Sequence, residues 1–287
     1  MKALVTGGCG FIGSNLVDRL IAKGYAVTAI DNLSSGTKDN INIKAEYIFQ
    51  DLSEVLLNEK KYNLNFEEFD CIFHLAAMPR IQPSFDDPLY TIDNNAYGTA
   101  VVCDIAKKYN LKIVYAGSSS FYGGVYLNPY SFSKWMGEEV CQMYSKVYGI
   151  SSCVARFFNV YGPRHLKTGP YSTVIGIFED QKQSNKSLTI TGTGEQRRDF
   201  THVYDICEAL IAMSKDTHAC EIFNLGTGTN YSINEVAAMF KHRVSYIAKR
   251  PGEAETTLAD ISKAKSMLGW EPKHSLRDYV EHFLEGK

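Results

Sequence analysis

This sequence of 287 residues has no run of ~18 apolar residues, the length that a membrane-spanning helix requires. Its first residues lead directly into glycines, without the apolar stretch of a secretory signal peptide. It also lacks an excess of charge: the formal net charge is only −2, so no global field attracts nucleic acid or an anionic membrane. We therefore expect a cytoplasmic protein with neither a nucleic-acid nor a membrane partner.

The cysteines lack the spacing of a metal or redox site. Seven are present, but no two have the close spacing of a metal-binding or redox motif, so no bound metal is expected. Several lie in apolar segments, where a thiol packs as a small hydrophobic group. Internal repeats and low-complexity segments are also missing. With 45% hydrophobic and 22% charged residues, the chain has the composition of an ordinary globular protein.

The first half of the chain alternates short apolar runs with helical patterns. We expect strands at residues 3–6, 26–30, 45–49, 71–75 and 112–116, and helices at 14–23 and about 93–109. This alternation predicts an α/β fold, a doubly wound parallel sheet of the Rossmann type with helices on both faces. Near residues 161–164 the sequence turns to Gly, Pro, Thr and charged residues. We therefore expect a Rossmann domain over 1–157, joined by a helix from about 201–215, and a smaller α/β substrate-binding lobe mainly over 158–287.

A glycine-rich segment, residues 6–13, lies between the first expected strand and the first expected helix. Glycines there allow a tight turn and a close approach of the backbone to a pyrophosphate, which the helix N-terminus attracts. The next strand ends in Asp31, eighteen residues after Gly13. A carboxylate there accepts the ribose hydroxyls of NAD and repels the 2′-phosphate of NADP. The alternative is a structural turn followed by an unrelated acidic residue; Asp51 and Leu52 fit an adenine contact and a surface turn equally well.

Tyr130 and Lys134 lie four residues apart in an expected helix that opens at Asn128 and Pro129, so they share one helical face. A tyrosine has a pKa of roughly 10 and needs a nearby positive charge to act as a base at neutral pH. Lys134 and an oxidised nicotinamide supply such charges. The pair alone is also typical of a solvated helix face. The serines at 118–120 make a catalytic role for the pair more convincing. They follow a strand at the carboxyl edge of the expected sheet, where ligands of doubly wound folds bind.

Together these features resemble the extended short-chain dehydrogenases/reductases, the NAD-dependent sugar epimerase/dehydratase family. The resemblance covers essentially the whole chain in the family's order. It rests on blocks at residues 6–13, 74–77, 95–99, 156–164, 198–200, 223–226, 250–253 and 258–264.

The resemblance implies a role for each of three sets of residues. The catalytic set is Ser118, Tyr130 and Lys134. The set for NAD is Gly7, Gly10, Phe11, Ile12, Gly13, Asp31, Asn32, Ser35, Gly36, Asp51, Leu52, Leu75, Ala76, Ala77, Asn95, Tyr130, Lys134 and Phe158. The set for the UDP-sugar is Ser118, Asn159, Thr173, Val174, Ile190, Thr191, Arg198, Arg250, Glu253 and Thr257. Arg198 and Arg250 are expected to face the diphosphate, since a guanidinium suits phosphate oxygens.

One departure from the family concerns the connection between Ser118 and Tyr130. These residues are only twelve apart, whereas the family's loop is usually about twice as long, a kind of change that surface loops tolerate. The short connection leaves open whether Ser118 or Ser119 is the catalytic serine.

The residues after Ser118 bear on the reaction. Family members that act as 4,6-dehydratases or UDP-glucuronate decarboxylases resemble one another in carrying an acidic residue there, whereas this chain has Ser119 and Ser120. The resemblance therefore favours a UDP-hexose 4-epimerase acting on UDP-glucose and UDP-galactose. Thr257, in place of a large aromatic residue, extends this to UDP-GlcNAc and UDP-GalNAc. The alternatives are UDP-glucuronate 4-epimerisation, another NAD-dependent chemistry on a sugar nucleotide, and a non-catalytic NAD-binding scaffold.

Two helices predict a homodimer. Ala96, Ala100 and Cys103 lie on one side of the helix at 93–109, and the helix after Tyr130 carries Met136, Val140, Met143, Tyr144 and Val147. Two apolar-faced helices per subunit suit an isologous four-helix contact, as the family resemblance also implies. The alternative is that both faces only cover the protein's own sheet.

Overall fold

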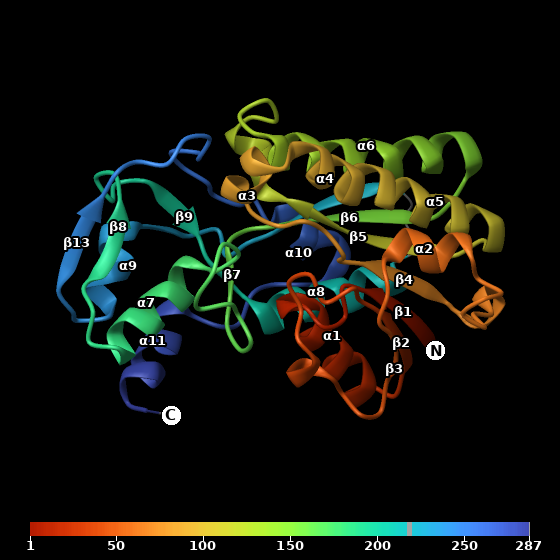
Figure 1. The fold of residues 1–287 in the computed structure, drawn as a ribbon, viewed down its shortest axis with the longest axis horizontal. Helices are drawn as coiled ribbons and strands as arrows, with labels where there is room; N and C mark the ends of the chain where they lie inside the picture. Colours follow the sequence, from red (N-terminus) through yellow and green to blue (C-terminus); the bar gives the residue numbers. More distant parts are fainter. Residues whose placement is uncertain (217–219, 287) are drawn as a thin grey trace.

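The computed structural model describes residues 1–216 and 220–286, and its centre is a seven-stranded sheet in which all neighbouring strands run parallel (Figure 1). In spatial order the strands are β11 (Glu221–Leu225), β6 (Ser152–Phe157), β5 (Lys112–Ser118), β4 (Cys71–His74), β1 (Lys2–Thr6), β2 (Ala26–Ile30) and β3 (Glu46–Ile48). The order reverses between β1 and β4, which is where doubly wound folds bind ligands. The predicted fold class is confirmed.

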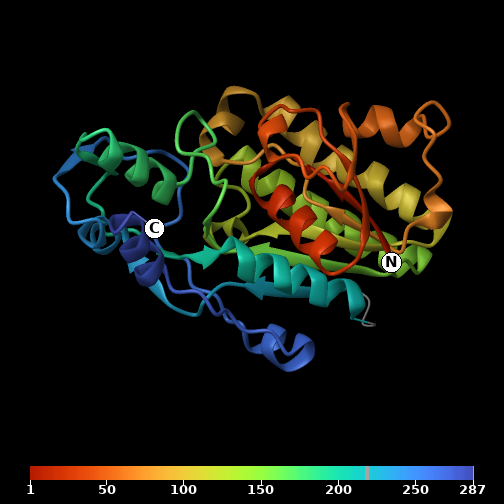
Figure 2. The same ribbon diagram turned by 90° about the horizontal axis from the view of Figure 1, so that it is seen from below.

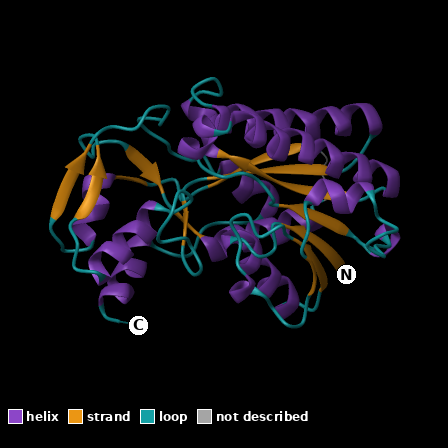
Figure 3. Cartoon of the chain, viewed as in Figure 1, coloured by secondary structure: helices purple, strands orange, loops and turns teal. Residues whose placement is uncertain are grey.

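Helices cover both faces of this sheet (Figure 3). On one face lie α2 (Leu52–Leu57), α3 (Ile81–Asp86), α4 (Pro88–Ile92), α5 (Gly98–Tyr109) and α6 (Pro129–Tyr148). On the other lie α1 (Phe11–Ala22), α8 (Val203–Lys215) and α10 (Ser262–Leu268), as the view from below shows (Figure 2). Alternation along β1 explains the two layers: Ala3 and Val5 pack toward α1 and α8, while Leu4 packs toward α2 and α5.

The helix predicted at 93–109 is interrupted. Residues Asp93–Tyr97 form a π-helical turn, η3, before α5 begins. The cause is local: the side chain of Asn95 turns inward, where it accepts a hydrogen bond from Met78 N at 2.7 Å and donates one to Ser133 Oγ at 2.9 Å. Such π-turns are frequent at functional sites, and this one fixes the loop after β4 against α6.

Helix α6 begins as its sequence predicts. Asn128 is the N-cap and accepts a hydrogen bond from Ser131 N at 2.7 Å, and Pro129 occupies the first turn. Short 3₁₀ turns connect other elements, namely η1 (Lys38–Asn40), η2 (Phe66–Glu68) and η4 (Ser119–Gly123). Because η4 directly follows β5 and leads toward α6, the serine segment and Tyr130 meet at the carboxyl edge of the sheet.

A smaller lobe follows β6 and has its own core, built around Tyr161, Phe178 and Phe240. Its helices are α7 (Val174–Gln183), α9 (Ile233–Met239) and α11 (Leu276–Leu284). Its strands form three pairs, β8 (Leu188–Thr191) with β13 (Val244–Ile247), β9 (Arg197–Asp199) with β12 (Asn230–Ser232), and β7 (Val160–Tyr161) with β10 (Thr201–His202). Within the described ranges, no helix is long and apolar enough to cross a membrane.

Candidate active site

A cavity of about 760 Å³ extends from the glycine-rich turn after β1, past the carboxyl edge of the sheet, to the smaller lobe. It brings most of the predicted site residues together. Those that line it are Gly7, Gly10, Phe11, Ile12, Gly13, Asp31, Asn32, Ser35, Asp51, Leu52, Leu75, Ala76, Ala77, Ser118, Tyr130, Lys134, Asn159, Thr173, Val174, Thr191, Arg198, Arg250, Glu253 and Thr257.

The glycine turn has the geometry of a phosphate cradle. Gly7 has a φ of +73°, and a Cβ added to Gly13 would lie 2.0 Å from Gly7 O, so a side chain at Gly13 would destroy the turn. No described side chain caps the N-terminus of α1 after Gly10. The first N–H groups of α1 are therefore available to an anion.

Asp31 is held at the end of β2. Its carboxylate accepts hydrogen bonds from Cys9 N at 2.8 Å and from Leu33 N at 2.7 Å, and it lines the cavity. Each oxygen keeps further acceptor capacity for a ribose hydroxyl. Asp51 has two roles in the structure, because it caps α2 by accepting from Ser53 N at 2.9 Å and also faces the cavity. The residues present thus fit a dinucleotide.

The block around His74 is structural. His74 is buried and pairs through Nδ1 with Thr6 Oγ1 at 2.8 Å and through Nε2 with Thr99 Oγ1 at 3.0 Å. Thr6 Oγ1 also accepts from Leu75 N and Ala76 N. Burial lowers the pKa of His74 to about 3, so the ring is neutral and ties β1, β4 and α5 together.

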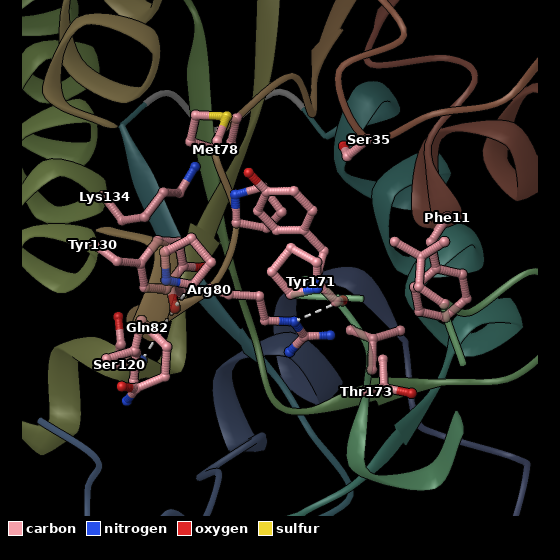
Figure 4. Close-up of a pocket in the computed structure, with 18 of the residues that line it drawn as sticks. Phe11, Ser35, Met78, Arg80, Gln82, Ser120, Tyr130, Lys134, Tyr171 and Thr173 are labelled. Atoms are coloured by element: carbon pink, nitrogen blue, oxygen red, sulfur yellow. Dashed lines mark hydrogen bonds between the residues drawn. The ribbon is translucent and has the colours of Figure 1, made fainter. Parts of the chain in front are cut away.

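Tyr130, Ser118 and Lys134 converge in the cavity. Tyr130 Oη donates to Ser118 Oγ at 3.4 Å, so the short connection brings Ser118, not Ser119, to the phenol. Figure 4 shows Tyr130 and Lys134 extending from α6. Burial raises the pKa of Tyr130, while the Ser118 hydrogen bond lowers it. Burial lowers the pKa of Lys134 to about 8, against the opposing effect of the Glu138 carboxylate.

A buried ion pair supports this group. Arg156 on β6 donates to Glu138 on α6 with Nη2 to Oε2 at 2.7 Å and Nε to Oε2 at 3.0 Å. The guanidinium also lies 3.6 Å from the centre of the Phe121 ring. Because Phe121 belongs to the turn after Ser118, and Glu138 lies one helical turn beyond Lys134, the pair fixes the serine segment against α6.

The residues predicted for the UDP-sugar surround the other end of the cavity. Arg198 Nη2 lies 3.8 Å from Glu253 Oε2, and Arg250 is exposed nearby on the cavity wall. Asn159 Nδ2 lies 3.4 Å from Thr257 Oγ1, and Thr257 is buried. Thr173 caps α7 through Gly176 N at 2.9 Å, so its hydroxyl already has a partner. Arg250 is exposed and suits phosphate oxygens, whereas the side chain of Arg198 is only 12% exposed and its Nη1 already donates to Arg197 O at 2.9 Å.

Four predicted residues do not line the cavity. Ile190 points into the core of the smaller lobe, because side chains alternate along β8 and the cavity receives Thr189 and Thr191 instead. Phe158 is fully buried behind Tyr122, with 5.9 Å between ring centres. Asn95 is buried in the contacts described above. Gly36 packs on Cys9, where an added Cβ would lie 2.8 Å from the backbone.

Arg80 lines the cavity and was not predicted. It follows the loop after β4 and donates from Nε to Tyr171 O at 3.2 Å (Figure 4). The signal in the sequence was a basic residue shortly after a strand that ends at the ligand-binding edge. The family block at residues 74–77 ends three residues before Arg80, so the resemblance does not cover it.

The comparisons with known proteins agree with this geometry. Residues 4–283 match the family model described as GDP-mannose 4,6 dehydratase. A Methanocaldococcus jannaschii protein with the provisional name UDP-glucose 4-epimerase is 38% identical, over 98% of this chain and 96% of its own. The chain belongs to this family of sugar-nucleotide epimerases and dehydratases. The predicted recognition as an extended short-chain dehydrogenase/reductase enzyme is confirmed.

Two solved structures support the family assignment. The UDP-glucose 4-epimerase of Thermotoga maritima with UDP-glucose superposes with a TM-score of 0.93 at 31% identity, covering 99% of this chain and 98% of the other. The UDP-glucuronic acid 4-epimerase of Bacillus cereus, in complex with UDP-glucuronic acid and NAD, gives 0.87 at 30% identity, covering 99% and 98%.

Proposed function

We propose that this protein is an NAD-dependent UDP-hexose 4-epimerase that interconverts UDP-glucose and UDP-galactose, and also UDP-GlcNAc and UDP-GalNAc. Residues 1–157 with the helix at 201–215 hold the dinucleotide, and residues 158–287 mainly hold the sugar nucleotide. The similarity to UDP-sugar 4-epimerases over nearly the whole chain supports this proposal.

Tyr130 acts as the base in this mechanism. Its phenolate takes the proton from the sugar 4-hydroxyl. Ser118 Oγ, which lies 3.4 Å from Tyr130 Oη, orients the sugar 4-oxygen by a hydrogen bond. Lys134 contributes a positive charge from the same helical face. The resulting 4-keto sugar turns within the cavity, after which Tyr130 returns the proton to the oxygen of the other epimer.

The chain's own residues fit NAD. The N–H groups at the start of α1 would hold the pyrophosphate, and the Asp31 carboxylate would accept hydrogen bonds from the ribose hydroxyls. NAD bound by these residues would supply the hydride acceptor for the oxidation of C4 and the hydride donor for the reverse step. No net oxidation results, so the cofactor need not leave between turnovers.

One observation favours epimerisation over elimination. The segment that follows Ser118 lines the cavity with Ser119 and Ser120, whose hydroxyls are poor acids and bases. The described carboxylates on the cavity wall are Asp31, Asp51, Asp86, Asp93 and Glu253, none of which belongs to this segment. A dehydratase or decarboxylase mechanism that uses an acidic residue directly after the catalytic serine is therefore not available.

Turnover with UDP-galactose, followed by coupled detection of UDP-glucose, tests the proposal. We expect epimerisation without added co-substrate, and UDP-GlcNAc should give UDP-GalNAc. A protein that binds NAD but converts neither pair would be a non-catalytic scaffold. Conversion of UDP-glucuronate alone would identify the acidic-sugar alternative.

A further inference from the structure

The ion pair between Arg156 and Glu138 is removed from water. The side chain of Glu138 is 1% exposed and that of Arg156 is 9% exposed. Desolvation of two charges costs free energy that their attraction only partly repays, and an apolar pair in the same place is often as stable. The stability of the fold therefore gives no reason for this pair, whereas the geometry that it fixes does.

The Arg156 guanidinium holds the turn that follows Ser118. In the sheet, Arg156 on β6 lies beside Gly117, the residue before Ser118. Its guanidinium carbon lies 3.6 Å from the centre of the Phe121 ring, and its Nη1 donates to Tyr122 Oη at 3.3 Å. One planar group thus contacts both aromatic residues of the turn, which the compact ammonium of a lysine cannot do.

The Glu138 carboxylate contacts the same segment from α6. A Cβ added to Gly117 would lie 2.7 Å from Glu138 Oε1, so the main chain at Gly117 packs directly on the carboxylate. Glu138 follows Tyr130 by eight residues and Lys134 by four, on the same side of the helix. The ion pair therefore connects the strand that ends at Ser118 with the side of α6 that carries the phenol.

The hydrogen bonds continue toward the sugar end of the cavity. Tyr122 Oη donates to Asn224 Oδ1 at 2.8 Å, and Asn224 Nδ2 donates to Asp260 O at 3.1 Å. Asn224 and Asp260 belong to blocks of the family resemblance that the mechanism does not use. Asp260 follows Thr257, a cavity residue, by three positions. The turn after the serine is thus also bonded to the segment that carries Thr257.

We propose that Arg156 and Glu138 are positioning residues that hold the Ser118 hydroxyl against the Tyr130 phenol. This inference rests on the proposed function, since it takes Tyr130 as the base. Neither residue of the pair lines the cavity, so both act through the serine segment. Ser118 Oγ lies 3.4 Å from Tyr130 Oη, a contact that a small shift of the segment breaks. A misplacement of about 1 Å can lower a rate by about 100-fold.

A variant of the NAD-loaded full chain with both partners replaced separates position from stability. Arg156→Met combined with Glu138→Met removes both charges together, so the melting temperature should stay close to that of the parent. Its kcat for UDP-galactose should fall by about 10- to 100-fold, because the serine segment is no longer held. KM should change little. The matched control replaces an exposed ion pair, Lys265→Met with Glu271→Met, and should leave kcat unchanged.

A second variant keeps both charges. This matters because the Glu138 carboxylate also raises the pKa of Lys134, so its removal alone changes more than position. Arg156→Lys retains a cation beside Glu138 but loses the two-pronged hydrogen bonds and the planar contact with Phe121. It should lose most of the activity that the Met pair loses. Unchanged kcat in Arg156→Lys overturns the inference.

A double-mutant cycle shows whether the pair acts through the serine. Ser118→Ala lowers kcat in the parent, and the same change should cost at least about threefold less in Arg156→Lys, where the serine is already displaced. Equal losses in the two backgrounds would mean that the pair acts independently of Ser118, and the inference would be wrong.

Crystal structures of the parent and of Arg156→Lys provide a measurement without turnover. The distance between Ser118 Oγ and Tyr130 Oη should be longer in the variant, and an unchanged distance contradicts the inference. If the parent epimerises no UDP-hexose, the proposed function fails, while this distance still decides whether the ion pair positions the serine.

Discussion

Ser118 Oγ lies 3.4 Å from Tyr130 Oη, although Ser118 ends β5 and Tyr130 is the second residue of α6. Replacing Tyr130 with Phe removes the proton acceptor and leaves the ring in place. We expect turnover of UDP-galactose to fall by about 100- to 10,000-fold, with NAD content nearly unchanged. Tyr126→Phe is the matched control, because Tyr126 is 81% exposed. Near-normal turnover in the Tyr130 variant would exclude the mechanism.

The serine assignment gives a separate prediction. Ser118→Ala should reduce kcat more than Ser119→Ala, because only Ser118 bonds to the Tyr130 phenol among the described serines. The loss should be smaller than for Tyr130→Phe, since the base remains. Single-turnover rates for both variants compare the two serines directly. A greater loss in Ser119→Ala would show that substrate binding moves the serine segment by one residue.

Cofactor choice depends on Asp31. The purified protein should release NAD(H), not NADP, when it is denatured. Asp31→Asn removes the negative charge. It should lower the ratio of NAD affinity to NADP affinity by about tenfold, which corresponds to ~1.4 kcal/mol. The control is Asp39→Asn, an exposed neighbour on η1. If NADP restores the activity of the unmodified apo-protein better than NAD does, the role of Asp31 is contradicted.

Some residues of the predicted dimer contact are not on the surface of the protein. Ala96 and Cys103 are buried within the chain, and Cys103 Sγ lies 3.8 Å from Cys141 Sγ on α6. Met143 and Val147 of α6 remain 43% and 63% exposed. If these helices form the subunit contact, Val147→Glu places a charge in it and should yield monomers.

Sedimentation at micromolar protein concentration measures the oligomeric state and so tests the dimer prediction. Ile43→Glu is the control, because Ile43 is 94% exposed and lies outside α5 and α6. A monomeric parent protein would show that both helices only cover their own sheet. Dimers that persist in Val147→Glu would place the contact on another surface.

The parts of the site that the sequence predicts best depend on short-range patterns. The glycine turn, Asp31 and the Tyr130–Lys134 pair lie within single strand–turn–helix segments, so spacing alone locates them. The directions of the Arg80 and Ile190 side chains could be found only from the three-dimensional structure. The direction of Arg80 follows from a positive φ that no pattern marks, and the direction of Ile190 follows from which face of β8 packs on the core of the smaller lobe. Similarly, β11 joins the sheet beside β6 through a contact distant in sequence.

Substrate breadth is expected to depend on Thr257, which is buried on the cavity wall with its N–H bonded to Arg197 O at 3.0 Å. Its small side chain leaves room beside the sugar, and its hydroxyl, 3.4 Å from Asn159 Nδ2, is placed to meet an amide. Thr257→Tyr should crowd an N-acetyl group at a cost of about 1–3 kcal/mol, which corresponds to a loss of about 5- to 150-fold.

The informative quantity is the ratio of kcat/KM for UDP-GlcNAc to kcat/KM for UDP-glucose, since a general loss of stability cancels in it. Thr257→Tyr should lower this ratio because the added ring fills the space next to the sugar. Thr256→Tyr adds the same ring at the exposed neighbouring position and should leave the ratio unchanged. If the parent does not convert UDP-GlcNAc, or if both variants give the parent's ratio, Thr257 does not control access. The pocket would then be shaped by other lining residues, such as Gly123 after the serine segment.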